Sequence, residues 1–216
     1  WQKIAPTVLL YQISSSLNMK ILTTLALLST MLGGWGGLNQ THLRKILAYS
    51  SIAHMGWMIV VMSINPTLAL LNLLIYIVAT LTLFLMLNLA SVTKIKSLTN
   101  LWNKSAPMTM IILLTLLSLG GLPPLTGFMP KWLILQELMS NNNVIVATLM
   151  ALSTLLNLFF YMRIIYASTL TMFPTINNSK VQWPYPQTKT TNIIPTLTII
   201  SSLLLPLTPL SISLLY

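Results

Sequence analysis

The sequence predicts an all-α membrane protein, a multi-span bundle of transmembrane helices. Of its 216 residues, 55% are hydrophobic and only 6% are charged, whereas a water-soluble domain carries about 25% charged residues. The apolar residues form long runs, and a helix crosses the hydrocarbon core with about 20 of them. Glycine and proline interrupt one of these runs. We therefore expect a helix bundle in a bilayer, with one discontinuous helix.

The chain divides into seven apolar segments. They are Trp1–Ile13, Met19–Leu38, Leu43–Met62, Leu68–Ala90, Met108–Met139, Val144–Ala167 and Ile193–Leu215. The first is too short to cross a membrane at a rise of about 1.5 Å per residue. Because the sequence does not start with methionine, we expect residues 1–13 to be the end of a truncated helix whose upstream part is missing.

The fifth segment is too long for one straight crossing. Six helix-breaking residues interrupt it: Gly120, Gly121, Pro123, Pro124, Gly127 and Pro130. Proline removes a backbone donor and clashes with the preceding turn, and unwound backbone at membrane depth is tolerated only inside protein or beside water. We predict two half-helices joined by an unwound stretch, the arrangement with which many transporters build ion sites.

Basic residues are distributed unevenly between the two sides of the predicted bundle. One side receives Arg44, Lys45, Lys94, Lys96, Lys104, Lys180 and Lys189, and the other receives Lys20 alone. Because inner loops are enriched in lysine and arginine, the first side is predicted to be inner and Tyr216 to lie on the outer side. Arg163 is expected to extend toward the headgroups. The basic residues form no stripe, which argues against nucleic-acid binding.

Cysteine-based sites and a dinucleotide-binding loop are not expected in this chain. It contains no cysteine, which excludes a disulfide, a thiolate metal site and an iron–sulfur cluster within it. The glycine run Gly33–Gly37 follows no strand and lacks the spacing of a dinucleotide-binding loop. We expect this run to form a tight turn or to permit close helix packing.

Two lysines, Lys3 and Lys131, are predicted to lie deep in the membrane. Lys131 directly follows the Gly/Pro interruption, and Lys3 precedes the polar stretch at Gln12 by roughly 14 Å of helix. A lysine at the centre of a membrane helix costs about 2.5–3.5 kcal/mol, and such residues usually line an ion path, where they can accept and release protons. The alternative for Lys131 is a structural tie to free carbonyls of the broken helix. For Lys3 both roles remain open.

Other polar residues give weaker signals. His54, one turn after Ser50 and Ser51, is either a proton relay near neutral pH or a neutral histidine bonded inside the bundle. Glu137, the only acid, is not on the same helix face as Lys131 and is expected at a membrane boundary. Six further side chains are expected to serve ordinary interhelical packing: Tyr49, Tyr76, Thr80, Asn88, Asn157 and Tyr161.

Two long motifs carry a family resemblance. GGWGGLNQTHLRKILAYSSIAHMGW, at Gly33–Trp57, and GGLPPLTGFMPKW, at Gly120–Trp132, resemble the subunit 2 family of mitochondrial NADH–ubiquinone oxidoreductase, respiratory complex I. The similarity runs from WQKIAP at Trp1 to LLPLTPL near the end. It implies an antiporter-like, proton-translocating subunit of the membrane arm, in the mitochondrial inner membrane, with the C-terminus on the intermembrane-space side.

The resemblance also implies a fold of two inverted five-helix repeats, each with a broken helix. Residues 19–167 match the second repeat and residues 193–215 the final helix, so the first repeat is expected upstream of Trp1. In the family, the lysine of the broken helix, the lysine of the WQK motif and the histidine of SSIAHMGW belong to the proton path. They match Lys131, Lys3 and His54.

No redox chemistry is expected in this chain, although the resemblance makes it a subunit of an NADH:ubiquinone reductase. NADH, FMN, iron–sulfur clusters and ubiquinone would belong to partner subunits, so no cofactor is expected here. The expected partners are other membrane-arm subunits and lipid. Two further functions remain open: a cation/proton antiporter (or antiporter subunit) of the same fold, and a non-conducting structural scaffold. A sodium requirement would favour the first, and intact pumping without Lys131 the second.

Overall fold

The computed structural model describes residues 3–16, 18–102, 105–171, 193–203 and 206. They form the helices α1 Ile4–Ile13, α2 Met19–Gly37, α3 Leu43–Met62, α4 Pro66–Leu89, α5 Ile95–Leu101, α6 Ala106–Gly120, α7 Phe128–Ser140, α8 Val144–Leu170 and α10 Ile193–Leu203. A short 3₁₀ helix, Ser14–Ser16, follows α1. Within the described ranges, extended pairing is limited to one isolated bridge, His42–Lys94. The prediction of an all-α protein is confirmed.

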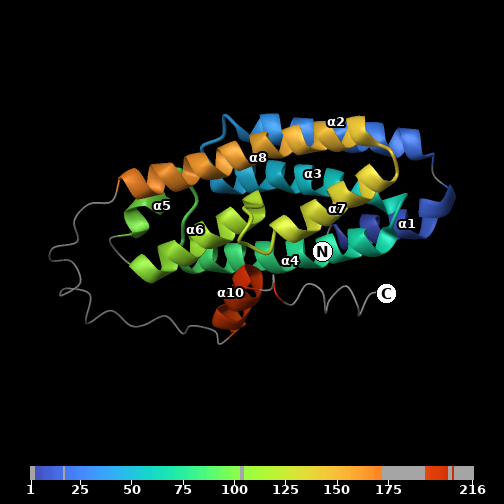
Figure 1. Ribbon diagram of the computed structural model, residues 1–216. Coiled ribbons are helices and arrows are strands. Elements are labelled where there is room, and N and C mark those ends of the chain that lie inside the picture. The colour runs from blue at the N-terminus through green and yellow to red at the C-terminus, as the bar shows by residue number, and fades with distance from the viewer. Residues whose placement is uncertain (1–2, 17, 103–104, 172–192, 204–205, 207–216) are drawn as a thin grey trace, which may run out of the picture.

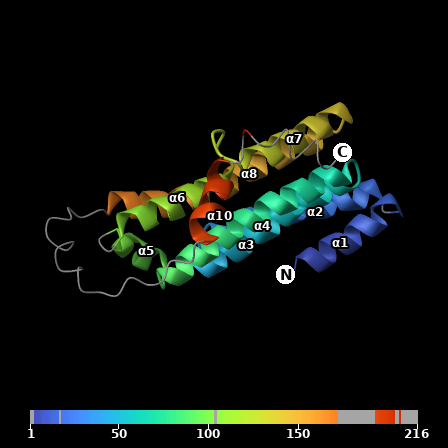
Figure 2. The ribbon, with the colours of Figure 1, turned by 90° about the horizontal axis from the view of Figure 1, so that it is seen from below.

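The long helices form one elongated bundle. α2 packs along α3 and α8, and α3 packs along α4. α6 and α7 follow one another along the bundle, while α10 lies across α4 and α6 (Figure 1). Seen from below, α10 is again crosswise, and α1 and α5 lie toward opposite ends (Figure 2). The last predicted segment is thus described only as α10, and its remainder after Leu203, with Tyr216, lies outside the described residues apart from position 206.

The outer surface of the bundle suits a lipid environment. In the described chain, α3, α4 and α8 are long and apolar enough to cross a membrane. α2 exposes a line of large apolar side chains: Ile21, Leu25, Leu28, Leu32 and Trp35. Their spacing of three and four residues places them on one helix face. The multi-span membrane bundle is confirmed, and the number of crossings stays a prediction.

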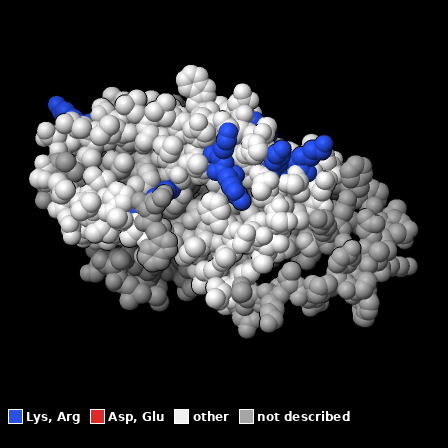
Figure 3. Space-filling model, turned by 180° about the vertical axis from the view of Figure 1, so that it is seen from behind, with Lys and Arg blue, Asp and Glu red and all other residues white. Residues whose placement is uncertain are grey.

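One end of the bundle, which we call the basic end, carries Arg44, Lys45, Lys94 and Lys96. Its loops are joined by backbone hydrogen bonds, from Leu43 N–H to the Thr93 carbonyl (3.1 Å) and from Ile95 N–H to the Thr41 carbonyl (3.2 Å). Lys20 lies in the first turn of α2, at the opposite end. In Figure 3 the basic side chains are separate blue islands on a mostly white face. Their distribution agrees with the predicted charge asymmetry for the described loops.

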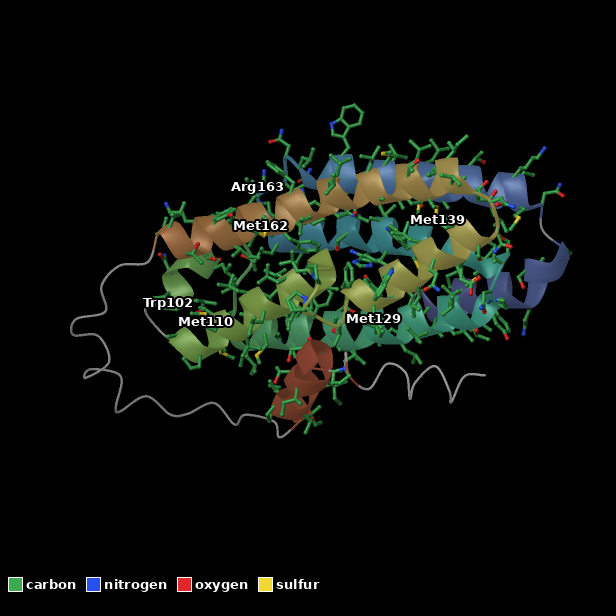
Figure 4. The ribbon with its side chains drawn as sticks, in the orientation of Figure 1. Trp102, Met110, Met129, Met139, Met162 and Arg163 are labelled. Atoms are coloured by element: carbon green, nitrogen blue, oxygen red, sulfur yellow. The ribbon has the colours of Figure 1, made fainter. Side chains whose placement is uncertain are left out.

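Arg163 corrects one expectation, because its side chain turns into the protein instead of toward the headgroups. Figure 4 labels it on α8, beside the loop that follows α2. Its guanidinium donates hydrogen bonds to the carbonyl of Leu38 and, at 2.6 Å, to that of Gln40. The last carbonyls of a helix lack intrahelical donors, so the end of α2 offers strong acceptors for a cation.

The glycine run lies entirely inside α2, so the tight-turn alternative is wrong. A Cβ atom on Gly33 would fall 2.7 Å from the backbone nitrogen of Ala53 in α3. On Gly37 it would fall 2.8 Å from the ring of Phe160 in α8. The absence of a side chain therefore lets α2 approach α3 and α8 closely, and the prediction of close helix packing is confirmed.

α5 was not expected, because its seven residues form no long apolar run. Lys94 caps its N-terminus, and the Lys94 N–H donates to the Ser97 hydroxyl at 3.1 Å. It buries Leu98 and Leu101 in contact with α6 and α8. Two buried leucines on a short helix give too weak a periodicity to identify it from the sequence.

Candidate functional site

The predicted helix break is present between α6 and α7. α6 ends at Gly120 and is capped by Gly121, which has a positive φ of 83° and donates its N–H to the carbonyls of Leu117 and Ser118. Such a left-handed residue is a common helix stop, and glycine adopts it without strain. Gly127 then passes so close to α6 that a Cβ there would lie 1.8 Å from the Ser118 carbonyl oxygen. The two half-helices and the unwound stretch are confirmed.

Lys131 lies in the first turn of α7 and points back at the end of α6. Its side chain is only 7% exposed. Its Nζ donates to the carbonyl oxygens of Gly120 at 3.0 Å and Leu119 at 3.4 Å. Carbonyls at a helix C-terminus carry partial negative charge, so they are strong acceptors for the Lys131 amine. The structural tie considered from the sequence therefore exists, and it leaves the amine beside the helix break.

Lys3 reaches the middle of the bundle from the start of α1. Its Nζ donates to the hydroxyl of Tyr76 on α4 at 2.6 Å and lies 4.3 Å from the centre of that ring. Both residues line a groove of about 650 Å³ together with Thr80. Lys3 is only half-buried, and its side chain forms part of the wall of this groove.

His54 on α3 lies between the two lysines. It is 8% exposed, and its ring centre is 4.9 Å from that of Tyr76, with the planes tilted by 40°. The charged amines of Lys131 and Lys3 both lie within electrostatic range of the imidazole, which also hydrogen-bonds to the backbone of Leu119. The structure thus brings the three predicted site residues together, in the order Lys3, Tyr76, His54, the Leu119 and Gly120 carbonyls, and Lys131. We call this arrangement the polar layer.

Apolar side chains lie on both sides of the polar layer. Toward the basic end is a buried cluster, the basic-end cluster, whose members include Ile46, Leu47, Ile112, Leu116 and Ile164. Toward the other end is a second cluster, which includes Trp57, Val60, Val61, Ile134 and Leu138. The polar layer therefore runs across the bundle between two apolar regions.

The sequence indicated that Glu137 lies apart from Lys131, but it did not indicate the contacts of Tyr76. Tyr76 was expected to serve ordinary packing, but it joins Lys3 to His54; nothing in its local sequence indicates a partner 73 positions away. Glu137 lies in the last turn of α7, two turns beyond Lys131 and outside the polar layer. Among the described residues, no group of three or more His, Cys, Asp or Glu side chains could hold a metal ion.

Comparison with known proteins identifies the family. Residues 2–157 match the family described as NADH:quinone oxidoreductase/Mrp antiporter, TM, and residues 158–212 match the NADH dehydrogenase subunit 2 C-terminus. The chain is 88% identical over 216 residues to NADH-ubiquinone oxidoreductase chain 2 of Osphranter robustus. It is 57% identical over 210 residues to that of Ovis aries. It covers 62% and 60% of the lengths of these relatives, while 100% and 97% of this chain is matched.

Solved structures share the fold. A chain of respiratory complex I from Thermus thermophilus aligns with a TM-score of 0.67 at 26% identity, over 86% of this chain and 42% of that one. A chain of the Mrp complex from Dietzia aligns with a TM-score of 0.70 at 15% identity, over 97% of this chain and 49% of that one. With the matched family and the broken helix, these similarities show that the chain belongs to the NADH:quinone oxidoreductase/Mrp antiporter membrane family.

Proposed function

We propose that this chain is part of a membrane-arm subunit of a proton-pumping NADH–ubiquinone oxidoreductase in the mitochondrial inner membrane. The similar proteins named above carry the name NADH-ubiquinone oxidoreductase chain 2. In this proposal, electron transfer through NADH, FMN, iron–sulfur clusters and ubiquinone takes place in partner subunits. The chain supplies part of the proton path, and its partners are other membrane-arm subunits and lipid.

The polar layer is the observation that carries this proposal. A buried lysine without a role is unfavourable, since placing it at the centre of a membrane helix costs about 2.5–3.5 kcal/mol. Here Lys3 and Lys131 both approach the same histidine. A proton relay is expected to consist of side chains that can gain and lose protons and that lie one after another across an apolar interior.

Each member of the polar layer has chemistry suited to this role. The Tyr76 hydroxyl accepts a hydrogen bond from Lys3 and can itself donate one, so it can receive a proton on one side while releasing another. The neutral imidazole of His54 has one ring nitrogen that donates and one that accepts, so it can receive a proton on one side and release one on the other. At Lys131, the Gly120 and Leu119 carbonyls hold the protonated amine. A proton that leaves Lys131 weakens this tie, so protonation is coupled to the contact between α6 and α7.

The proposal includes an organisation and an orientation. Residues 19–167 form the second five-helix repeat of an inverted-repeat fold, preceded by the end of a helix at 1–13 and followed by a final helix at 193–215. The basic end faces the matrix, in agreement with the enrichment of lysine and arginine on inner sides. The C-terminus would then lie on the intermembrane-space side.

A cation/proton antiporter is the second candidate. The matched family covers both oxidoreductases and Mrp antiporters, and the Mrp complex shares the fold. Sodium-dependent proton movement without NADH oxidation would favour this candidate. A non-conducting scaffold is disfavoured, because a scaffold has no need for two lysines beside one buried histidine.

Substitution of Lys131 tests the proposal. Lys131→Ala removes the amine, and Lys131→Met removes the charge while keeping much of the volume. In the full-length protein within the assembled complex, both should greatly reduce NADH-driven proton uptake while complex abundance stays near normal. Lys96→Ala, at an exposed lysine of α5, is the matched control and should pump normally. Normal proton uptake in a fully assembled Lys131→Met complex would contradict the proposal.

A further inference from the structure

The unwound stretch of the broken helix has a partner outside the polar layer, the crosswise helix α10. The Thr126 hydroxyl, near the end of this stretch, donates a hydrogen bond to the Ser201 carbonyl of α10 at 2.5 Å. Thr126 is 1% exposed and Ser201 is 3% exposed, so the bond lies inside the protein. The hydroxyls of Thr115 and Ser118 in α6 instead donate to carbonyls three positions earlier in their own helix. Thr126 therefore joins two segments that are 75 positions apart.

The acceptor on α10 is available because of where this helix stops. α10 ends at Leu203, and the last four carbonyls of a helix have no donor within it. Ser201 supplies one of these carbonyls, while its own hydroxyl donates to the carbonyl of Thr198 at 3.0 Å. A carbonyl at a helix C-terminus carries partial negative charge, so it is a strong acceptor for a hydroxyl. The bond from Thr126 therefore satisfies a carbonyl that α10 itself cannot satisfy.

α10 is also held at its other end. Ile194, in its first turn, is 7% exposed and belongs to the basic-end cluster. α10 packs on α4 and α6, and Figure 1 shows it crosswise beside the place where α6 gives way to α7. The seven positions from Ile194 to Ser201 correspond to about 10 Å of helix. α10 is thus a short rigid element between a packed apolar cluster and the helix break.

The bond from Thr126 acts on the spacing between the two half-helices. Gly127, the next residue, already lies against the Ser118 carbonyl of α6, so the start of α7 cannot come closer to α6. The bond opposes movement in the other direction, because α10 packs on α6 and holds the unwound stretch to it. Lys131 follows in the first turn of α7, and its amine reaches the Gly120 carbonyl at 3.0 Å. Since hydrogen bonds tolerate only a narrow range of distances, this spacing decides whether Lys131 keeps its contact.

We propose that α10 is a brace for the broken helix and that Thr126 is a positioning residue for Lys131. Through the Ser201 carbonyl, α10 holds the unwound stretch against α6 and so keeps the Lys131 amine on the carbonyls at the end of α6. The brace and the break come from different parts of the chain. Thr126 lies within the residues that match the antiporter family, and α10 lies within those that match the subunit 2 C-terminus. The brace follows from the contacts of this chain alone, and its effect on proton transfer rests on the proposed function.

Hydrogen–deuterium exchange in the assembled complex tests the brace. Thr126→Val keeps the shape of the side chain and removes its hydroxyl. Amide exchange in residues 121–127 should become about two- to tenfold faster, the factor expected for the loss of one hydrogen bond, and Thr126→Ser should restore it. Thr115→Val is the matched control, because Thr115 is also 1% exposed but its hydroxyl bonds within α6. Unchanged exchange in Thr126→Val, or an equal increase in Thr115→Val, would overturn the brace.

The number of protons taken up per NADH oxidised tests the positioning role. Thr126→Val should lower this ratio in the same direction as Lys131→Met but by less, and Thr126→Ser should recover it. A contact that serves stability alone would lower complex abundance and NADH oxidation together and leave the ratio unchanged, and that result would refute the positioning role. Exchange does not depend on pumping, so a failure of the proposed function, seen as normal pumping in Lys131→Met, is distinguished from a failure of the brace.

Discussion

Gly127→Ala is a sharp test of how the helix break is built. The backbone of Gly127 has φ −67°, which any residue adopts, so a substitution here adds no conformational strain. The obstacle is steric. The new Cβ would lie 1.8 Å from the Ser118 carbonyl oxygen, and Cβ atoms essentially never come within 3.0 Å of such an atom. The start of α7 and the end of α6 would therefore have to separate by about 1.2 Å.

The expected cost follows from this displacement. Overpacking a well-packed interior costs about 1–3 kcal/mol, and here the obstructing atom is backbone, which cannot turn aside. Gly120→Ala is the matched control in the same break. Its Cβ would meet Leu158 Cδ1 at 3.3 Å, the movable tip of a side chain, and alanine is better than glycine in a helix by about 0.5–1 kcal/mol. The two variants should differ by about 1.5–4 kcal/mol.

Thermal inactivation of the assembled complex in detergent provides the measurement, together with its abundance in membranes. Gly127→Ala should lower the midpoint temperature of inactivation. It should also reduce proton uptake, because Lys131 lies one helical turn after Gly127 and would be displaced with it. Gly120→Ala should match or exceed the wild type in stability. Equal midpoints for the two variants would refute the close contact between Gly127 and Ser118.

Three further predictions concern other contacts. Arg163→Met should destabilise the complex by about 1.5–3 kcal/mol, because it removes charged hydrogen bonds to two carbonyls. Arg163→Lys should recover part of the lost thermal stability. An inactivation midpoint that is unchanged in both variants would contradict the contact between Arg163 and the end of α2. Lys96→Cys introduces the only cysteine of this chain. Its thiol should react with a membrane-impermeant reagent only from the matrix side of oriented vesicles. Reaction from the outer side would overturn the proposed orientation. Tyr76→Phe should lower NADH-driven proton uptake, because Lys3 loses its acceptor while the ring beside His54 is kept. Uptake equal to that of the wild type would remove the Tyr76 hydroxyl from the path.

The break and its lysine could be predicted because their causes are local. Glycine and proline between Gly120 and Pro130 cannot continue a helix, and Lys131 follows them directly in the chain. Arg163 shows where such prediction fails. A boundary position favoured a solvated side chain, but the free carbonyls that bind it belong to the end of α2, more than 120 positions away.

The sequence by itself determined the class of this protein, because composition and the length of apolar runs decide whether a chain can face lipid. It also determined the position of the helix break and which end of the bundle carries more basic residues. Only the tertiary structure decided which polar groups meet. Three contacts depend on how helices distant in the chain pack together: Lys3 with Tyr76, His54 with Tyr76, and Arg163 with the end of α2. The physical reason is that periodicity fixes which face of a helix a residue occupies, whereas its partners are fixed by the neighbouring helix that this face contacts.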